Sequence, residues 1–269
     1  MRRVATLAFL VLGACAELGV VGDGTSVSVG KPSRGYLLDG ARVPNSGDGF
    51  TTRDVWIHRG ARYGTDELVE LVTGVARRMH GKFKDVRIVV GDLSTRGGAG
   101  GDSFHRSHQS GRDADLLYYL RDASGKAVEP DAMHALDKEG VAKDGSGLHM
   151  DFARQWLLVK ELLTAPEANV QWLFLYEPLA KKVLAHAADI GEDPELVARA
   201  RKALRQPGDS APHDDHMHVR VYCTDADKAD GCEDMGPMEL HDASRPGVAA
   251  QLPAELGKAL AVAGSHWID

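Results

Sequence analysis

The residues best suited to chemistry lie in two short histidine-rich clusters that are far apart in the sequence. The first cluster contains His105 and His108, followed by Asp113 and Asp115. Side chains alternate along a strand, so the two aspartates share one face if a strand begins near Asp113. A loop histidine can fold back over that acidic face. Imidazole and carboxylate groups together form a ligand set that suits Zn²⁺, so this cluster predicts part of a metal site.

The second cluster covers residues 213–221 and ends in an alternating pattern. His216, His218 and Arg220 share one face of the expected strand, and the apolar residues between them share the other. The apolar face can pack on the core while both histidines point into one cavity. A His-x-His pair on a strand can present one metal ligand and a neighbouring base, and His213 lies on the loop that leads into it.

Other catalytic schemes lack their residues in this sequence. There is no His-Glu-x-x-His pair and no Gly-x-Ser-x-Gly elbow. The dinucleotide-binding fingerprint is also missing, and the glycine-rich segment 94–104 lacks the Gly-Lys-Ser/Thr ending of a phosphate loop. Metal-activated water is the chemistry that remains.

Length and composition are those of an ordinary globular protein. The chain has 269 residues, of which 43 % are hydrophobic and 26 % charged, and its formal net charge is −7. These values exclude a collagen-like or mostly disordered chain and fit one large domain or two small ones. A protein that neutralises phosphates normally carries a basic excess, so we expect no nucleic-acid partner.

The first fifteen residues have the pattern of an export signal. A basic start at residues 1–3, an apolar run over 4–11 and small residues before Cys15 are typical of a secretory signal peptide. The segment 12–15, Leu-Gly-Ala-Cys, also resembles a bacterial lipobox, in which the lipidated cysteine becomes the first mature residue. Cleavage near Ala16 is the alternative. We expect a periplasmic location, and with a lipobox the membrane contact would be a lipid anchor in the outer membrane.

Removal of Cys15 leaves one pair of cysteines, Cys223 and Cys232. Export places this pair in an oxidising compartment, and the polar residues between them suit a turn closed by a disulfide. A metal-binding pair is the alternative, but it lacks the short Cys-x₂₋₄-Cys spacing. The sequence therefore predicts a Cys223–Cys232 disulfide.

The elements that must position these clusters follow from hydrophobic periodicity and turn signals. Thr65 is a good N-cap for a helix with an acidic first turn. The other expected elements are strands over 86–90, 113–120, 170–176 and 216–223 and helices over 152–163, 179–188 and 195–204. This mixture predicts an α+β fold, a single domain with a central antiparallel sheet flanked by helices and long loops, with the metal site at strand ends.

The two clusters, taken in order, resemble the motifs of the penicillin-insensitive murein endopeptidases, within the wider lysostaphin and D-Ala-D-Ala metallopeptidase group. The signature of that group is a histidine, six residues, an aspartate and later His-x-His, which His108, Asp115 and residues 216–218 match. Similarity runs over about residues 30–232. The closer resemblance covers the segments 107–115, 171–174 and 213–220.

The resemblance implies a zinc enzyme that hydrolyses D-alanyl–meso-diaminopimelyl cross-links in peptidoglycan. By the same resemblance, His108, Asp115 and His218 would bind the zinc. His216 would be the general base, and His213 would assist it or stabilise the oxyanion. No acyl-enzyme would form, so β-lactams should not inhibit.

The resemblance also raises the question of a second metal ion. His105 aligns with a histidine that helps to bind a second metal in relatives. Asp144, His149 and Asp151 are the available candidates to complete that site, the first two also as substrate contacts, but their spacing departs from the family pattern. We therefore expect one Zn²⁺.

Two alternatives remain open at this point. The same metal chemistry would serve a carboxypeptidase that trims terminal D-Ala from stem peptides, and a non-catalytic zinc-binding cell-wall protein would need neither His213 nor His216. The expected organisation is a signal peptide over 1–15, a linker and irregular N-terminal arm over 16–50, a metallopeptidase domain over 51–235 and a C-terminal tail over 236–269.

Overall fold

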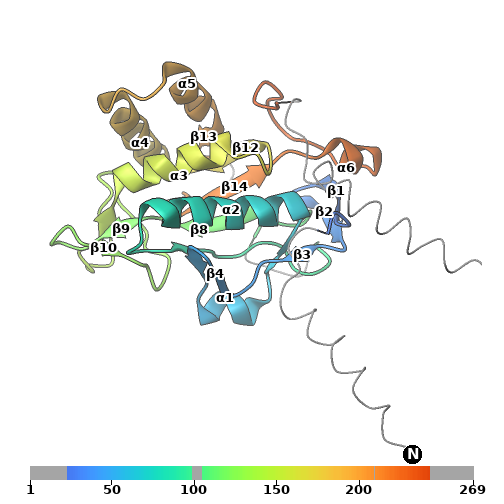
Figure 1. The fold of residues 1–269 in the computed structure, drawn as a ribbon, viewed down its shortest axis with the longest axis horizontal. Helices are drawn as coiled ribbons and strands as arrows, with labels where there is room; N and C mark the ends of the chain where they lie inside the picture. The colour runs from blue at the N-terminus through green and yellow to red at the C-terminus, as the bar shows by residue number, and fades with distance from the viewer. Residues whose placement is uncertain (1–22, 99–104, 209, 243–269) are drawn as a thin grey trace, which may run out of the picture.

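The central feature of the fold is a four-stranded sheet with the strand order β13-β12-β14-β8 (Figure 1). The computed structural model describes residues 23–98, 105–208 and 210–242. β12 and β13 run parallel, and the other two pairs of strands are antiparallel. The strand bounds are β8 (Asp113–Leu117), β12 (Val170–Phe174), β13 (Leu204–Arg205) and β14 (His216–Val221).

Helices cover the apolar face of this sheet (Figure 1). The longest begins after Thr65, whose side chain accepts a hydrogen bond from the Leu68 amide as an N-cap should. Asp151 and Asp193 cap two further helices in the same way. The helix bounds are α1 (Asp54–Arg59), α2 (Asp66–Lys82), α3 (Phe152–Thr164), α4 (Glu177–Asp189), α5 (Pro194–Ala203) and α6 (Asp225–Ala229).

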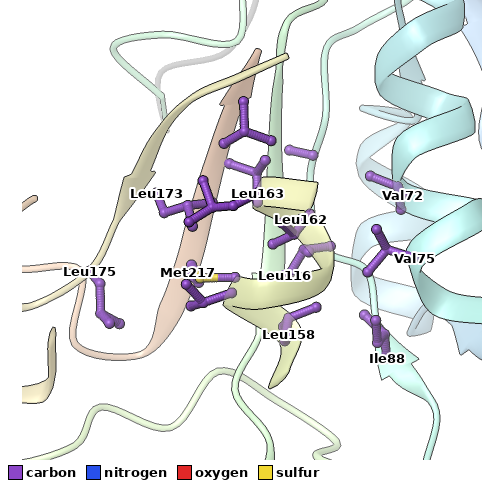
Figure 2. Close-up of a cluster of buried hydrophobic side chains, with 14 of the residues drawn as sticks. Val72, Val75, Ile88, Leu116, Leu158, Leu162, Leu163, Leu173, Leu175 and Met217 are labelled. Carbon is purple, nitrogen blue, oxygen red and sulfur yellow. The ribbon is translucent and has the colours of Figure 1, made fainter. Parts of the chain in front are cut away.

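The core lies between the sheet and α2 and α3. Figure 2 shows Leu158 and Leu162 of α3 against Leu116 of β8 and Met217 of β14, with Val75 of α2 beside them. All five side chains are 0–1 % exposed. Burying a side chain of this size stabilises a fold by about 1.5–3 kcal/mol relative to leaving it exposed. Because the apolar positions of each strand are taken by this core, the polar positions of β8 and β14 face the other side.

Short strands occupy a region where we expected no regular structure. The expected linker and irregular arm over 16–50 forms several strands from Val27 onward, and the Ser28 amide donates to the Asp227 carboxylate at 3.1 Å. Runs of two to five residues between glycine turns give no readable periodicity, which is why the pattern missed them. These strands are β1 (Val27–Lys31), β2 (Arg34–Leu38), β3 (Ala41–Arg42), β4 (Ser46–Gly47) and β5 (Phe50–Thr51).

The remaining strands are short and lie in small sheets away from the central one. β1 pairs with β2, β3 with β6, and β5 with β4 and β7, while β9 pairs with β10 and β11. Their bounds are β6 (Tyr63–Gly64), β7 (Ile88–Val89), β9 (Leu120–Arg121), β10 (Ala127–Val128) and β11 (His149–Met150).

The predicted disulfide between Cys223 and Cys232 is confirmed. It joins the end of β14 to a segment that pairs with Gly30 of β1. The expected signal peptide over 1–15, with Cys15, lies outside the described residues, as do 16–22 and the tail beyond 242. Within the described residues, no helix is long and apolar enough to cross a membrane.

Candidate metal centre

The polar face of the central sheet carries a row of side chains that crosses all four strands. His218 of β14 lies opposite Asp115 of β8 on one side and Phe174 of β12 on the other. Arg205 of β13 lies opposite Phe174 in turn. This register places two of the predicted metal ligands next to each other on neighbouring strands.

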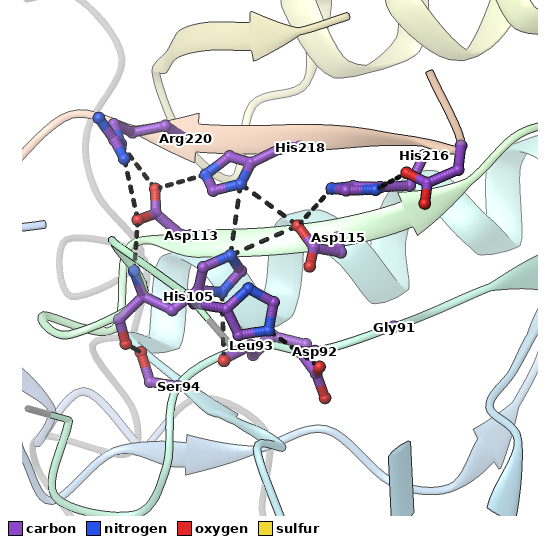
Figure 3. Close-up of polar contacts among 12 residues, drawn as sticks. Gly91, Asp92, Leu93, Ser94, His105, Asp113, Asp115, His216, His218 and Arg220 are labelled. Atoms are coloured by element: carbon purple, nitrogen blue, oxygen red, sulfur yellow. Dashed lines mark hydrogen bonds and ion pairs between the residues drawn. The ribbon is translucent and has the colours of Figure 1, made fainter. Parts of the chain in front are cut away.

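His108 reaches the same point from the loop that precedes β8. Its backbone has φ of +67°, a left-handed conformation that is uncommon for a residue other than glycine. The backbone is held in place because the His108 amide donates to Asp113 at 2.9 Å and the Ser94 hydroxyl donates to the His108 carbonyl. His108 Nδ1 lies 3.2 Å from the Leu93 carbonyl, which leaves Nε2 directed at Asp115. Figure 3 shows His218 next to Asp113 and Asp115 in this cluster.

Three donor atoms form a nearly equilateral triangle. Asp115 Oδ1 lies 3.4 Å from His108 Nε2 and 3.3 Å from His218 Nδ1, and these two nitrogens are 3.3 Å apart. Zinc–ligand distances of about 2.0–2.2 Å at tetrahedral angles give ligand–ligand distances of about 3.3–3.6 Å. Both carboxylate oxygens of Asp115 are buried and lack a hydrogen-bond partner among the described residues. The three donors therefore fit one tetrahedral metal ion with a fourth position for water.

The charge of Asp115 suits this role. Burial raises the pKa of its carboxyl, but His216 and His108 lower that pKa well below the usual value. Asp115 is therefore ionised at neutral pH although it is completely buried. An ionised carboxylate and two imidazoles supply the hard and borderline donors that Zn²⁺ accepts.

Asp113 orients His218. Its carboxylate lies 3.1 Å from His218 Nε2, so that nitrogen carries the proton and Nδ1 is free to bind a metal. Arg220 fixes the carboxylate by donating to it from Nε at 2.6 Å and from Nη2 at 3.1 Å. Burial raises the pKa of Asp113, but Arg220 and His218 outweigh it and lower the pKa well below its usual value. Sequence spacing placed Asp113 on this face but gave it no role.

His216 and His213 lie beside the triangle and differ in charge. Burial lowers the pKa of His216, but the carboxylates of Asp115 and Asp215 outweigh it and raise the pKa to about 10. His216 Nδ1 lies 2.6 Å from Asp215, and its Nε2 lies 3.3 Å from Asp115. Burial, together with the neighbouring His218 and His216, lowers the pKa of His213 to about 3. His213 is therefore neutral at pH 7.

The loop before β14 positions His213. The His213 amide donates to the side chain of Gln206 at 2.8 Å, and the Tyr118 hydroxyl donates to the His213 carbonyl at 2.6 Å. Gln206 also donates to the Pro207 and Ala211 carbonyls, so one carboxamide closes the whole loop. Sequence reasoning missed Gln206, because nothing in its type or spacing distinguishes it from a surface glutamine.

The residues considered for a second metal do not come together. His105 lies in the same cluster as His108 and Asp115, and its Nε2 is 3.0 Å from the buried carboxylate of Asp92. Asp144 instead pairs with His134, and His149 lies in the short strand β11. Neither Asp144 nor His149 lines the pocket that contains His105. Asp92 was missed by the sequence reasoning, although a carboxylate directly after the expected strand 86–90 was the available signal.

A pocket of about 740 Å³ opens over this cluster. His108, His218 and His216 line it beside the buried Asp115, and the aromatic rings of Trp172 and Phe174 line it together with Arg205 and residues 210–213. The ring centroid of Phe174 lies 5.1 Å from that of His218. A cavity of this size accommodates several residues of a peptide.

Fold and site together define an α+β protein in which His108, Asp115 and His218 form a buried donor set, suited to a metal ion, beside a large pocket. The family model described as penicillin-insensitive murein endopeptidase matches residues 28–256, and the chain belongs to this family.

Curated relatives agree with this assignment. A protein named penicillin-insensitive murein endopeptidase from Haemophilus influenzae is 28 % identical to this chain, over 82 % of this chain and 71 % of the relative. A protein of that name from Klebsiella pneumoniae is 25 % identical, over 80 % of this chain and 72 % of the relative. A protein of the same name from Salmonella arizonae is 26 % identical over 78 % of this chain and 71 % of its own length. The expected family resemblance is therefore confirmed.

Proposed function

We propose that this protein is a zinc-dependent murein endopeptidase that hydrolyses D-alanyl–meso-diaminopimelyl cross-links in peptidoglycan. The observation that carries the proposal is the triangle of His108 Nε2, Asp115 Oδ1 and His218 Nδ1, with sides of 3.3–3.4 Å. Family membership supports the peptidase activity and the murein substrate.

The three ligands would leave one coordination position for water. Bound Zn²⁺ supplies a water of lowered pKa and polarises the substrate carbonyl. Asp115 contributes the negative charge, and the Leu93 carbonyl and Asp113 set which ring nitrogens of His108 and His218 are free to bind. This arrangement requires no nucleophilic serine, so β-lactams should not inhibit.

His216 and His213 would divide the proton transfers between them. Asp115 raises the pKa of His216, so coordination of that carboxylate to a cation would remove part of the charge that keeps the ring protonated. His216 could then accept the proton of the attacking water, with Asp215 holding its other nitrogen. His213 is neutral and close to both His216 and His218, where a ring N–H would stabilise the oxyanion.

The test is the metal content of purified variants. We expect one equivalent of zinc in the wild type and in His216→Ala, and a large loss in His108→Ala, Asp115→Ala and His218→Ala. His216→Ala should lose about 10²–10⁴-fold in cleavage of cross-linked muropeptides while it keeps its zinc. Full zinc occupancy in the three ligand variants would refute the assignment.

We also propose export to the periplasm by the signal over residues 1–15, with lipid attachment at Cys15. The lipobox pattern Leu-Gly-Ala-Cys supports this proposal. A fatty-acid analogue should label the wild type but not Cys15→Ser. An unlabelled wild type found in the soluble periplasmic fraction would contradict the lipid anchor.

A further inference from the structure

The pocket has a positively charged wall that the proposed mechanism does not use. Arg205 is the last residue of the edge strand β13, and its guanidinium carbon lies 5.3 Å from the centroid of the Trp172 ring. Among the residues that the structure describes, no carboxylate forms an ion pair with this guanidinium. An arginine stacked on an indole is restrained in conformation but keeps its N–H donors available to a ligand.

The Trp172 ring is itself fixed in place. Its Nε1 donates to the Met235 carbonyl at 3.3 Å, and only 7 % of the residue is exposed. Gly236 packs so closely that an added Cβ would lie 2.7 Å from the ring, and its φ of +125° is one that glycine adopts readily. The C-terminal segment therefore holds the indole rigidly beneath Arg205.

Sheet geometry places Arg205 close to the metal centre. Arg205 lies opposite Phe174, and Phe174 lies opposite His218, so two strand spacings separate Arg205 from a metal ligand. Adjacent strands are ~4.7–4.9 Å apart, which puts the two backbones about 10 Å from each other. An extended peptide advances ~3.3–3.6 Å per residue. A substrate whose scissile bond lies at the metal centre would therefore bring a residue one to three positions away to Arg205.

Three arginines line the pocket: Arg106, Arg205 and Arg220. Arg106 follows His105 in the loop before β8, whereas Arg205 lies on β13. Asp113 neutralises Arg220 through two hydrogen bonds. Asp215, a carboxylate on the pocket wall, is bound to His216. Arg205 thus gives this part of the pocket a positive charge in a chain whose formal net charge is −7.

We propose that Arg205, positioned by Trp172, binds a free carboxylate of the substrate peptide. The pocket then selects acidic peptides that carry this carboxylate one to three residues from the scissile bond. The inference rests on the proposed endopeptidase function, because the position of the scissile bond is set by the metal centre. Guanidinium and carboxylate groups match in a bidentate geometry, which makes arginine specific for this ligand.

The experiment uses synthetic cross-linked peptides in matched pairs, identical except that one carboxylate is replaced by a carboxamide at each of the three positions. We expect the wild type to cleave the carboxylate form of one pair with a kcat/KM at least about tenfold higher, mainly through KM, because a charge-assisted hydrogen bond is lost with the amide. Arg205→Gln should lower kcat/KM for the carboxylate peptide to the value for the amide peptide. It should leave kcat/KM for the amide peptide unchanged. Arg205→Lys should retain part of the preference.

Arg201→Gln is the matched control, since Arg201 is an exposed arginine of α5 outside the pocket. Arg201→Gln removes one positive charge from the neighbouring helix, and it should keep the full wild-type preference for the carboxylate peptide over the amide peptide. Equal cleavage of every pair by the wild type, or a preference that survives in Arg205→Gln, would overturn the inference while leaving the endopeptidase assignment intact.

Binding measurements separate this inference from the proposed function. If the wild type cleaves none of the peptides, the endopeptidase assignment fails. Calorimetric Kd values for the same peptide pairs then test separately whether Arg205 binds the carboxylate. Tighter binding of the carboxylate form by the wild type but not by Arg205→Gln would support the carboxylate site. Equal Kd values for both forms would contradict it.

Discussion

Replacing Asp113 by asparagine tests how the metal ligands are oriented. The carboxylate of Asp113 is completely buried and contacts His218 Nε2 at 3.1 Å, the His108 amide at 2.9 Å and Arg220 at 2.6 Å. It therefore touches two of the three proposed ligands without lying in the donor triangle. Asp113→Asn keeps the size of the side chain and one acceptor oxygen but removes the negative charge.

The size of the effect follows from these contacts. Loss of a hydrogen-bonding group behind a metal ligand typically costs about 10–100-fold in metal affinity, or about 1.4–2.7 kcal/mol. The variant also leaves Arg220, whose side chain is 11 % exposed, without its charged partner. Breaking a buried ion pair lowers the free energy of unfolding by about 3–5 kcal/mol. Because the asparagine amide keeps part of the contacts of Asp113, we expect a loss of about 2–3 kcal/mol.

The pH dependence has a definite sign. Because the pKa of Asp113 is lowered in the folded protein, its contribution to stability is complete above the unfolded pKa and is lost only as the pH falls through the lowered folded value. The stability difference between the wild type and Asp113→Asn should therefore be constant between about pH 5 and 8.

Competition with a chromophoric zinc chelator gives the metal affinity, and urea unfolding gives the stability. Asp215→Asn is the matched control, because Asp215 contacts His216 but none of the three ligands. It should bind zinc like the wild type, whereas Asp115→Asn should lose more affinity than Asp113→Asn. A folded Asp113→Asn protein with wild-type zinc affinity would refute the orienting role of Asp113.

Two further predictions concern residues outside the donor triangle. Gln206→Ala removes the acceptor that holds the His213 amide, so muropeptide cleavage should fall about ten- to hundredfold while the zinc content stays unchanged. Wild-type turnover in this variant would show that the loop keeps its conformation without the Gln206 side chain. Burial raises the pKa of Glu67 to about 7, so the folded state retains a proton that the unfolded chain loses, and stability falls as the pH rises from about 4.5 to 7. Glu67→Gln should therefore stabilise the protein at pH 8 by about 1–2 kcal/mol after allowance for solvent screening, and leave it unchanged at pH 4 in urea unfolding. Equal stabilities at both pH values would contradict the burial of an ionisable Glu67.

Local sequence patterns predicted the main strands of the central sheet and the helices that pack on it. The alternation over 216–221 placed His216 and His218 on one face and the apolar residues on the other, as β14 shows. The N-cap at Thr65 and the hydrophobic periodicity after it predicted α2. These features depend on neighbouring residues in the chain, which is why the sequence alone was sufficient.

Features that depend on distant contacts were not predictable. Asp113 orients His218 only because β8 pairs with β14, and spacing within one strand could not reveal this contact. Gln206 and Asp92 likewise act on His213 and His105 through bonds that the fold creates.

The N-terminal strands were missed for a related reason. From Val27 onward the expected linker is held by long-range bonds, such as that between Ser28 and Asp227, rather than by its own periodicity. Sequence patterns therefore predicted which side chains gather at the candidate site better than the contacts that hold them in position.

Mass spectrometry of purified cross-linked muropeptide dimers after incubation with the protein shows directly whether the protein is a zinc-dependent endopeptidase. We expect the zinc-loaded protein to convert dimers to monomers at the D-alanyl–meso-diaminopimelyl bond, also in the presence of a β-lactam. Chelation should abolish the conversion and added zinc should restore it, but not in His218→Ala. Conversion that survives complete removal of the metal, or release of terminal D-Ala with the dimers left intact, would contradict a zinc-dependent endopeptidase.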